Sequence, residues 1–169
     1  LWNTCTDIAS EHVLRFDKND NFWEMGEVGP CGPCSELHID LGQGTCPLSD
    51  KHECAVNLEG CWRFVELWNL VFMQYQRFTD GHLEELSAQH VDTGMGLERI
   101  CRVLQEVDSN YSTDLFVPIL EKISEVTGQA DSGEDASVAF RVIADHLRSL
   151  SFAIADGALP SNEGRGYVL

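Results

Sequence analysis

The fold is decided by one stretch of the chain, residues 64–75, which reads FVELWNLVFMQY. Aromatic and β-branched residues dominate this stretch, and β-strands favour both kinds. Because hydrophobic residues follow one another almost without a break, the pattern predicts a strand buried on both faces. Residues 79–82, TDGH, are a turn signal, so we expect a hairpin that returns through residues 83–86. Another short strand should end near residues 91–93.

Two shorter strands are predicted before this hairpin, at residues 21–25 and 36–41. Residues 29–34 between them read GPCGPC, and this density of proline and glycine excludes a helix and indicates a rigid loop. Residues 42–62 are largely polar, bear cysteines and show no periodicity. We interpret this segment as an insertion in a loop.

Helices are predicted after the strands. The run Gly94-Met95-Gly96 opens a helix whose apolar residues lie three and four positions apart. Asp114 is expected to cap a second helix, which Gly128 ends. A third helix should run from about residue 136 to residue 155.

A polar, glycine-containing segment near residues 129–135 marks a boundary between two units. The first unit, residues 1–129, is expected to hold a mostly antiparallel sheet with two helices. The second, residues 130–169, should be an incomplete helical unit. The sequence therefore predicts an α+β protein, and neither end looks like a natural terminus, so we expect a fragment of something longer.

Composition limits the classes of function. The chain has 169 residues, of which 43% are hydrophobic, and this is ordinary for a folded domain. Its formal charge of −17 repels phosphates, so any contact with nucleic acid must be local or use basic surface outside this chain. No stretch approaches the roughly 20 apolar residues that a membrane span needs. The odd number of cysteines favours reduced thiols or a metal, and a reducing cytoplasm is the default compartment.

Four segments, taken together and in order, resemble alanyl-tRNA synthetases. They are NFWEMG with GPCGPCSE in residues 21–36, ELWNLVFMQ at 66–74, VDTGMGLER at 91–99, and RVIADH with PSNEGRGYVL in residues 141–169. The GLER of residues 96–99 resembles motif 3 of class II synthetases. The resemblance implies activation of alanine with ATP and Mg²⁺ to alanyl-adenylate, then transfer to the 3′ end of alanine tRNA.

The same resemblance implies that motifs 1 and 2 lie before residue 1, and that the editing domain and further tRNA-binding segments follow residue 169. We therefore expect the isolated chain to be inactive and to depend on the remaining segments of a full-length synthetase. In this interpretation residues 1–129 are the second part of the class II catalytic domain. Residues 130–169 begin the helical tRNA-recognition domain.

The predicted alanine pocket has one charged member, Asp92. A carboxylate at a strand end is fixed in place and complements the ammonium group of an amino acid; the alternative is that Asp92 caps the following helix with Thr93. The resemblance supplies the remaining walls of the pocket, with Asn69 reaching the carboxylate, Val71 bounding the methyl group and Gly94 leaving room for the backbone to approach. The complete predicted set is Trp23, Asn69, Val71, Asp92 and Gly94.

The predicted ATP and Mg²⁺ residues are Glu66, Gly96 and Arg99. The resemblance makes Glu66 the acid that helps to hold Mg²⁺ on ATP. The cost of burying an acid inside so apolar a strand favours a functional role in general. The guanidinium of Arg99 suits the terminal phosphates of ATP, and the alternative is an ordinary ion pair with a neighbour. For tRNA, the resemblance places Asn162 at the acceptor stem and Arg165 at backbone phosphate, whereas the residues alone make Asn162 a turn residue.

The cysteines fall into separate groups. Cys31 and Cys34 are interpreted as structural packing. A second group, in the insertion, is a candidate tetrahedral Zn²⁺ site that would hold a polar loop together, with free thiols as the alternative. Its four candidate ligands are Cys46, His52, Cys54 and Cys61. Similar cysteine-containing insertions in some bacterial members of the family raise the case for zinc slightly.

Two other classes of function compete with the enzyme fragment. The first is an RNA-binding module built around residues 138–169, a hypothesis that salt-dependent tRNA binding would support. A zinc-stabilised structural domain without a catalytic role is the other, and stoichiometric zinc without binding of an adenylate analogue would support it.

Overall fold

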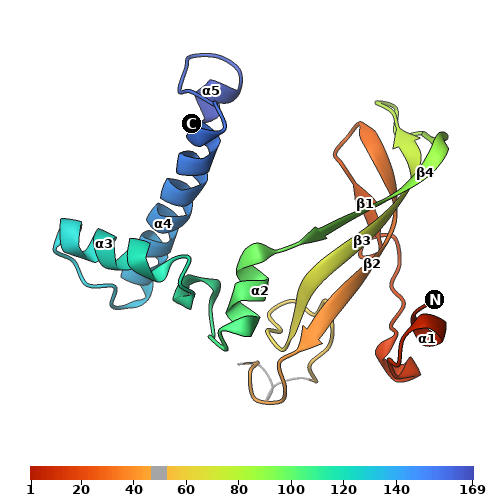
Figure 1. Cartoon of the computed structure of the whole chain (residues 1–169), viewed down its shortest axis with the longest axis horizontal. Coiled ribbons are helices and arrows are strands. Elements are labelled where there is room, and N and C mark those ends of the chain that lie inside the picture. Colours follow the sequence, from red (N-terminus) through yellow and green to blue (C-terminus); the bar gives the residue numbers. More distant parts are fainter. Residues whose placement is uncertain (47–52) are drawn as a thin grey trace. The chain divides into compact units, whose positions relative to one another are not determined.

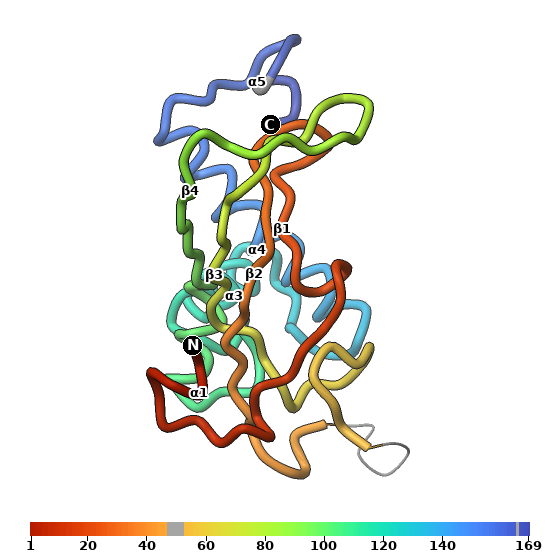
Figure 2. Tube along the Cα trace, turned by 90° about the vertical axis from the view of Figure 1, so that its right-hand side faces the viewer, coloured from red at the N-terminus to blue at the C-terminus, as the bar shows by residue number. Residues whose placement is uncertain are grey.

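The computed structural model describes residues 1–46 and 53–169 (Figure 1). It contains two compact units, Leu1–Ile100 and Cys101–Leu169. The first holds a short helix, α1 (Trp2–Cys5), and a four-stranded antiparallel sheet in the order β1-β2-β3-β4 (Figure 2). The strands are β1 (Phe22–Glu24), β2 (Gly29–Asp40), β3 (Phe64–Arg77) and β4 (Leu83–Met95). Together with the helices that follow, this sheet confirms the predicted α+β class.

The long apolar stretch forms β3, as predicted, and β3 pairs with both β2 and β4. The expectation that β3 is buried on both faces is wrong in this chain. Only Val71, at 6% exposure, is buried in β3, and the other side chains of the strand are half-buried. The reason is that the extensive packing in this unit runs between neighbouring strands and not across the faces of the sheet.

The GPCGPC segment is not a loop, and this prediction is wrong. It forms the first half of β2, where Gly32 pairs with Trp23 on one side and Cys31 pairs with Tyr75 on the other. A register shift between Cys31 and Cys34 provides the irregular pairing that prolines need inside a sheet. A Cβ on Gly32 would lie 2.0 Å from the carbonyl oxygen of Phe72, so only glycine permits this approach of the two backbones.

The predicted turn joins β3 to β4. The amide of Phe78 donates to the carbonyl of His82 at 3.1 Å, and the amide of Gly81 donates to the carbonyl of Phe78 at 2.8 Å. The return strand is longer than expected. The two short strands predicted near residues 83–86 and 91–93 are one strand, β4, which an irregularity opposite Met73 and Tyr75 interrupts.

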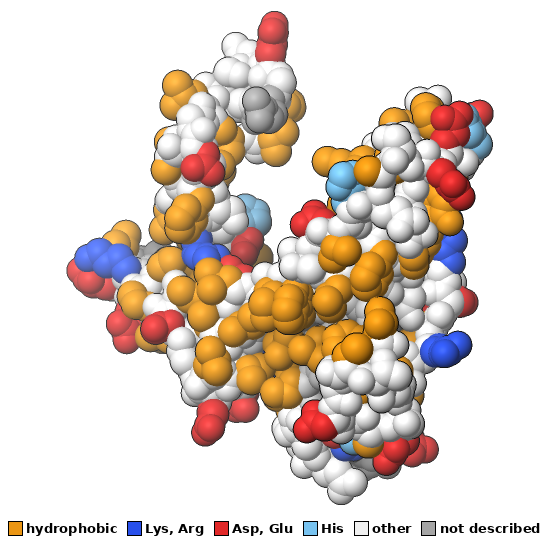
Figure 3. Space-filling model, turned by 45° about the vertical axis from the view of Figure 1, so that its right-hand side comes forward, with side chains coloured by type: hydrophobic (Ala, Val, Ile, Leu, Met, Phe, Trp, Pro, Cys, Tyr) orange, Lys and Arg blue, Asp and Glu red, His pale blue; other side chains and the backbone are white. Residues whose placement is uncertain are grey.

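The second unit is helical. It packs around Phe116, Ile123, Phe140 and Ala144. The predicted helix after the glycines is α2 (Leu97–Leu104), which begins in the first unit and ends in the second. The remaining helices are α3 (Val117–Thr127), α4 (Glu134–Ala155) and α5 (Arg165–Val168). Many other hydrophobic side chains, drawn in orange in Figure 3, reach the surface.

The ends of α3 test two predicted caps. Gly128 takes the left-handed conformation, with φ of 67°, and ends α3 as expected. Asp114 is not the N-cap, because α3 begins after Phe116. Instead the Asp114 carboxylate accepts a hydrogen bond of 2.6 Å from Gln105 Nε2.

The functional division predicted after residue 129 stays a prediction. No helix in the described ranges combines the length and apolar character needed to cross a membrane.

Candidate functional site

A cavity of about 370 Å³ lies on the sheet of the first unit. It is lined by Trp23 of β1, by Glu66, Asn69, Val71 and Met73 of β3, and by Asp92, Thr93 and Gly94 of β4. Six of these eight residues are ones that the sequence assigned to alanine, ATP or Mg²⁺. The structure therefore brings all five predicted alanine-binding residues, and Glu66, to one cavity.

The strand register explains why side chains from two strands share this cavity. Val71 pairs with Asp92, and Asn69 pairs with Gly94. Directly opposed residues of an antiparallel pair point to the same face, and residues two apart on one strand do so too. Val71, Asn69 and Asp92 consequently project from one face of the sheet, beside a glycine that leaves the face open.

A β-bulge brings Glu66 to that same face. On β2, His38 pairs with Glu66 and Leu37 pairs with Trp68, so Leu67 is one extra residue on β3. Without the extra residue, Glu66 and Asn69, three positions apart, would point to opposite faces. The bulge thus places an acid on the cavity side of a largely apolar strand.

Asp92 lies within β4, and its side chain is exposed. Because α2 begins at Leu97, Asp92 is too far away to cap it, and the alternative interpretation of Asp92 as a helix cap is wrong. The carboxylate stands in register with the buried Val71. A negative charge beside a small apolar wall suits a ligand with an ammonium group and a small side chain.

Glu66 and Arg99 contact each other. Arg99 Nη1 donates to Glu66 Oε2 at 2.9 Å and to the Glu66 carbonyl oxygen at 3.1 Å. Both side chains are partly exposed, at 45% for Arg99 and 34% for Glu66, so a ligand can reach them. Gly96 lies against the Arg99 side chain, since a Cβ added to Gly96 would be 3.4 Å from Arg99 Cδ. Two residues predicted for ATP and Mg²⁺ therefore neutralise each other in this structure.

Sequence reasoning missed Glu36, which is paired with Asn69 across β2 and β3, and His38, which contacts Glu36. Asn69 Nδ2 donates to Glu36 Oε1 at 3.2 Å, and His38 Nε2 lies 2.9 Å from Glu36 Oε2. A signal was present, because residues 36–41 alternate between polar and apolar side chains and so predict a shared polar face. Met73 and Thr93 were also missed as cavity residues.

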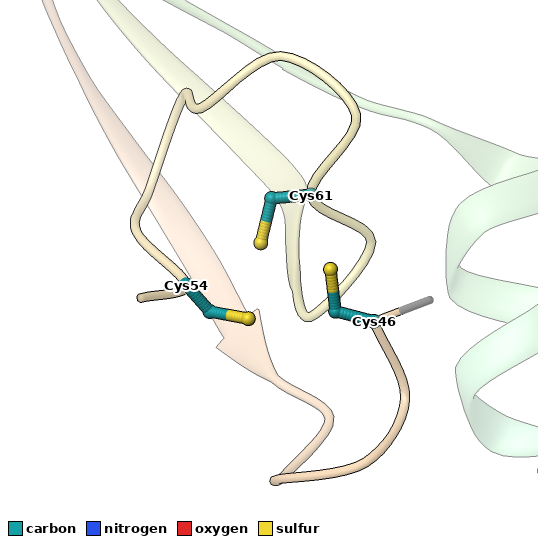
Figure 4. Close-up of side chains that lie close together, drawn as sticks. All are labelled: Cys46, Cys54 and Cys61. Atoms are coloured by element: carbon teal, nitrogen blue, oxygen red, sulfur yellow. The ribbon is translucent and has the colours of Figure 1, made fainter. Parts of the chain in front are cut away.

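Three cysteine thiols of the insertion converge at a second place. The Sγ atoms of Cys46, Cys54 and Cys61 all lie within 4.8 Å of one another and point inward (Figure 4). Two thiolates on one tetrahedral Zn²⁺ would be about 3.8 Å apart, given Zn–S bonds of about 2.3 Å. The three sulfurs thus fit a thiophilic cation after a small contraction. The fourth predicted ligand, His52, lies outside the described residues.

Burial raises the pKa of three of the cysteine thiols. All seven cysteines are among the described residues, and none forms a disulfide. Partial burial, followed by hydrogen bonding to the other two thiols of the cluster, raises the pKa of Cys54 to about 11. Burial is also the main cause that raises the pKa of Cys31 and Cys34, which keeps both thiols protonated and agrees with their predicted packing role.

The two residues predicted for tRNA lie in the second unit. Asn162 is exposed in a bend that precedes α5. Arg165 begins α5, and its side chain lies outside what the structure describes. These placements leave both tRNA assignments as predictions.

Comparison with known proteins supplies the family. The family described as tRNA synthetases class II (A) matches residues 1–169. Proteins named alanine–tRNA ligase are 56% identical over 172 residues in Chlorobium phaeobacteroides, 58% over 174 in Chlorobium chlorochromatii and 52% over 170 in Christiangramia forsetii. Each alignment covers 100% of this chain and 19% of the relative, so the chain spans about a fifth of their length. The chain belongs to the family described as tRNA synthetases class II (A), the family that its motifs predicted.

Proposed function

We propose that this chain carries the alanine-binding part of the aminoacylation site of an alanine–tRNA ligase. The observation that carries the proposal is the cavity on the sheet, which gathers Trp23, Asn69, Val71, Asp92 and Gly94 from three strands. The identity to proteins named alanine–tRNA ligase supports the choice of substrate.

The chemistry of activation needs positioning more than covalent help. The alanine carboxylate oxygen attacks the α-phosphorus of ATP, the new P–O bond forms, and the bond to pyrophosphate breaks. Asp92 binds the ammonium group and Asn69 donates to the carboxylate, so the attacking oxygen is held in one orientation. Val71 limits the space for the side chain to about one methyl group.

ATP binding changes the pairing of Glu66 and Arg99 in this proposal. A hard divalent cation such as Mg²⁺ would supply charge neutralisation at the phosphates, and Glu66 offers it an oxygen ligand. Arg99, released from Glu66, turns its guanidinium to the terminal phosphates, with Gly96 leaving space for the turn. The ion pair therefore keeps both side chains in place until ATP separates them.

The second step, transfer of the alanyl group to the 3′ end of alanine tRNA, uses surface beyond the cavity. Asn162 and Arg165 are proposed to contact the acceptor stem, where an amide reads base edges in the shallow groove of an RNA helix. With a charge of −17, this chain gains tRNA affinity only together with the remaining segments of a full-length protein in the cytoplasm. The isolated chain is accordingly expected to be inactive in aminoacylation.

We further propose that Cys46, Cys54 and Cys61 hold Zn²⁺. The convergence of three sulfurs within 4.8 Å supports this assignment. His52 is the predicted fourth ligand. With His52 as the fourth ligand the role of the ion is structural, because four protein ligands leave no open position for a substrate.

The test is alanine-dependent exchange of labelled pyrophosphate into ATP by the full-length protein that carries this chain. We expect exchange with alanine, weaker exchange with glycine and serine, and none with leucine, because a pocket for one methyl group excludes larger side chains and discriminates poorly among small ones. Exchange with another amino acid and not with alanine would overturn the proposal.

A second measurement concerns the isolated chain. Calorimetric titration with a non-hydrolysable alanyl-adenylate analogue should detect binding that Asp92→Asn abolishes, if the cavity is preformed. If the folded chain binds no analogue, the pocket forms only in the presence of the remaining segments of the full-length protein.

A further inference from the structure

We propose that Glu36 is a positioning residue for the alanine site, which it serves by fixing the carboxamide of Asn69. Glu36 is not among the residues that line the cavity, so any effect on the substrate must pass through a neighbour. The inference rests on the proposed function of the cavity, and it adds a residue to which neither the motifs nor the comparisons give a role.

The register of the sheet puts Glu36 directly beside Asn69. The two residues are opposed in the pairing of β2 with β3, and Asn69 is opposed to Gly94 on its other side. Asn69 Nδ2 donates to Glu36 Oε1 at 3.2 Å. Because the opposite neighbour is a glycine without a side chain, Glu36 is the cross-strand side chain that can orient this amide.

The chemistry of the two groups fixes the direction of the amide. An ionised carboxylate only accepts hydrogen bonds, whereas a carboxamide has one donating and one accepting end. Glu36 therefore draws the nitrogen of Asn69, and not its oxygen, to the β2 side. The other polar neighbour of this amide is the Cys34 thiol, a weak hydrogen-bonding group. The second hydrogen on Nδ2 is the one that we assign to the substrate carboxylate, which requires a donor.

A second donor holds Glu36 itself. His38 Nε2 lies 2.9 Å from Glu36 Oε2, and both side chains are only 15% exposed. Each carboxylate oxygen thus has its own partner, and the low exposure limits competition from water. The carboxylate is held at two points and transmits a defined orientation to Asn69.

The alternative orientation would be harmful to binding. If the carboxamide turned over, its oxygen would replace the donor and face the carboxylate of alanine, which also only accepts. The Asn69 Oδ1 atom is already buried with no hydrogen-bond partner among the described residues, so this oxygen does not hold the amide in place. Of the two side chains that contact the amide, the Glu36 carboxylate is a far stronger acceptor than the Cys34 thiol, so we assign the orientation to the bond with Glu36.

The experiment is a double-mutant cycle in the full-length protein, with Glu36→Gln, Asn69→Ala and the double variant. Glutamine keeps the shape of Glu36, but its amide presents either end to Asn69 and no longer enforces one orientation. We expect the KM for alanine in pyrophosphate exchange to rise about tenfold in Glu36→Gln, with the KM for ATP changed less than about twofold, as for loss of one hydrogen bond to a charged group. In the Asn69→Ala background, Glu36→Gln should add no further effect.

The control variant is Glu85→Gln, which removes an exposed acid near the distant end of β4 and should leave both KM values unchanged. The inference is wrong if the effects of Glu36→Gln and Asn69→Ala on the KM for alanine multiply in the double variant. It is also wrong if the KM values for alanine and ATP rise together while the melting temperature falls, because Glu36 then has a structural role. Should Glu36→Gln fail to fold, Glu36→Asp, which withdraws the carboxylate by one methylene, must give the same separation of the two KM values.

The outcome also separates this inference from the proposed function. A wild-type protein without alanine-dependent exchange overturns both. A wild-type protein with exchange, and a Glu36→Gln variant that matches it, overturns only the role of Glu36.

Discussion

The cavity on the sheet and the cysteine cluster are built by different means. The residues that line the cavity stand on β1, β3 and β4, so backbone hydrogen bonds between strands fix their spacing. Cys46, Cys54 and Cys61 lie outside helices and strands. Only their side chains meet, and the insertion closes at its base through Asp40 and Arg63.

This difference predicts how each site responds to its ligand. A strand ladder holds the cavity before any substrate arrives, so binding there has little ordering entropy to overcome. Metal ligands that lie outside regular structure, as these three cysteines do, gain their order from the ion, so binding and local folding are one event. Substitutions in the strand ladder should therefore lower the stability of the fold, whereas substitutions in the thiol cluster should lower the affinity for the ion.

The largest effect is expected at the closest backbone contact of the ladder. Gly32→Ala places a Cβ 2.0 Å from the carbonyl oxygen of Phe72, which the rigid pairing of β2 with β3 has no room for. We expect a loss of about 3 kcal/mol or more of stability, or no folded protein. Chemical denaturation measures it.

Gly94→Ala is the matched control, because a Cβ there meets nothing within 4 Å. This variant should fold normally and weaken alanine binding by narrowing the cavity. Equal stability losses in both variants would mean that the backbone approach at Gly32 does not distinguish the two strand glycines.

The sequence predicted six of the eight residues that line the cavity, but not the means that assemble them. Trp23, Asn69 and Asp92 come from segments whose motifs are recognisable, and the strand pattern around residues 64–75 located their scaffold. The bulge at Leu67 was invisible, since an extra residue shows only when two strands are paired. GPCGPC was interpreted as a loop for the same reason. The close backbone approach that requires a glycine there appears only when β2 is paired with β3.

The second prediction concerns the cysteine cluster. Cys61→Ser should lower zinc affinity by more than the roughly 10- to 100-fold typical of changes to residues behind a metal ligand, because it removes a ligand itself. Cys5→Ser, at an exposed thiol, is the control and should keep full zinc content. Metal analysis after dialysis against a chelator measures both. Equal zinc in the two variants, or none in the wild type, would leave the cluster as free thiols.

Asp92→Asn comes next in size. The substitution keeps the shape of the side chain and removes the charge that the proposal pairs with the ammonium group. We expect the KM for alanine to rise by roughly 30- to 150-fold, as for about 2–3 kcal/mol of a charged hydrogen bond, with normal stability. Pyrophosphate exchange measures it, and Asp108→Asn in the second unit is a control. An unchanged KM for alanine would remove Asp92 from the pocket.

The smallest effect is expected at the base of the insertion, where Arg63 Nε and Nη2 both donate to the Asp40 carboxylate at 2.6 Å. These hydrogen bonds are the main cause that lowers the pKa of Asp40. Arg63→Met keeps an apolar stem beside the Phe64 ring and removes the donors. The pKa of Asp40 should rise toward its ordinary value of about 3.9, which carboxyl NMR titration measures.

The pH dependence of stability has a definite sign. A carboxyl whose pKa is lower in the folded state stabilises the protein above its ordinary pKa, and this contribution is lost as the pH falls through the lowered pKa. Because Asp40 is 44% exposed, solvent screens the pair, and Arg63→Met should lower the melting temperature by only about 1–2 °C at pH 7. The difference should shrink as the pH falls below about 4.

Lys122→Met provides the control for this pair, since Lys122 and Glu125 form an exposed ion pair on one face of α3. Its melting temperature should change less than that of Arg63→Met, because the pair has one hydrogen bond where Arg63 and Asp40 have two.

If zinc is bound, both melting temperatures should be measured before and after its removal. A larger effect of Arg63→Met in the zinc-free protein would mean that the ion and the Arg63–Asp40 pair close the same insertion in parallel, whereas an equal effect would make the base of the insertion independent of the thiol cluster.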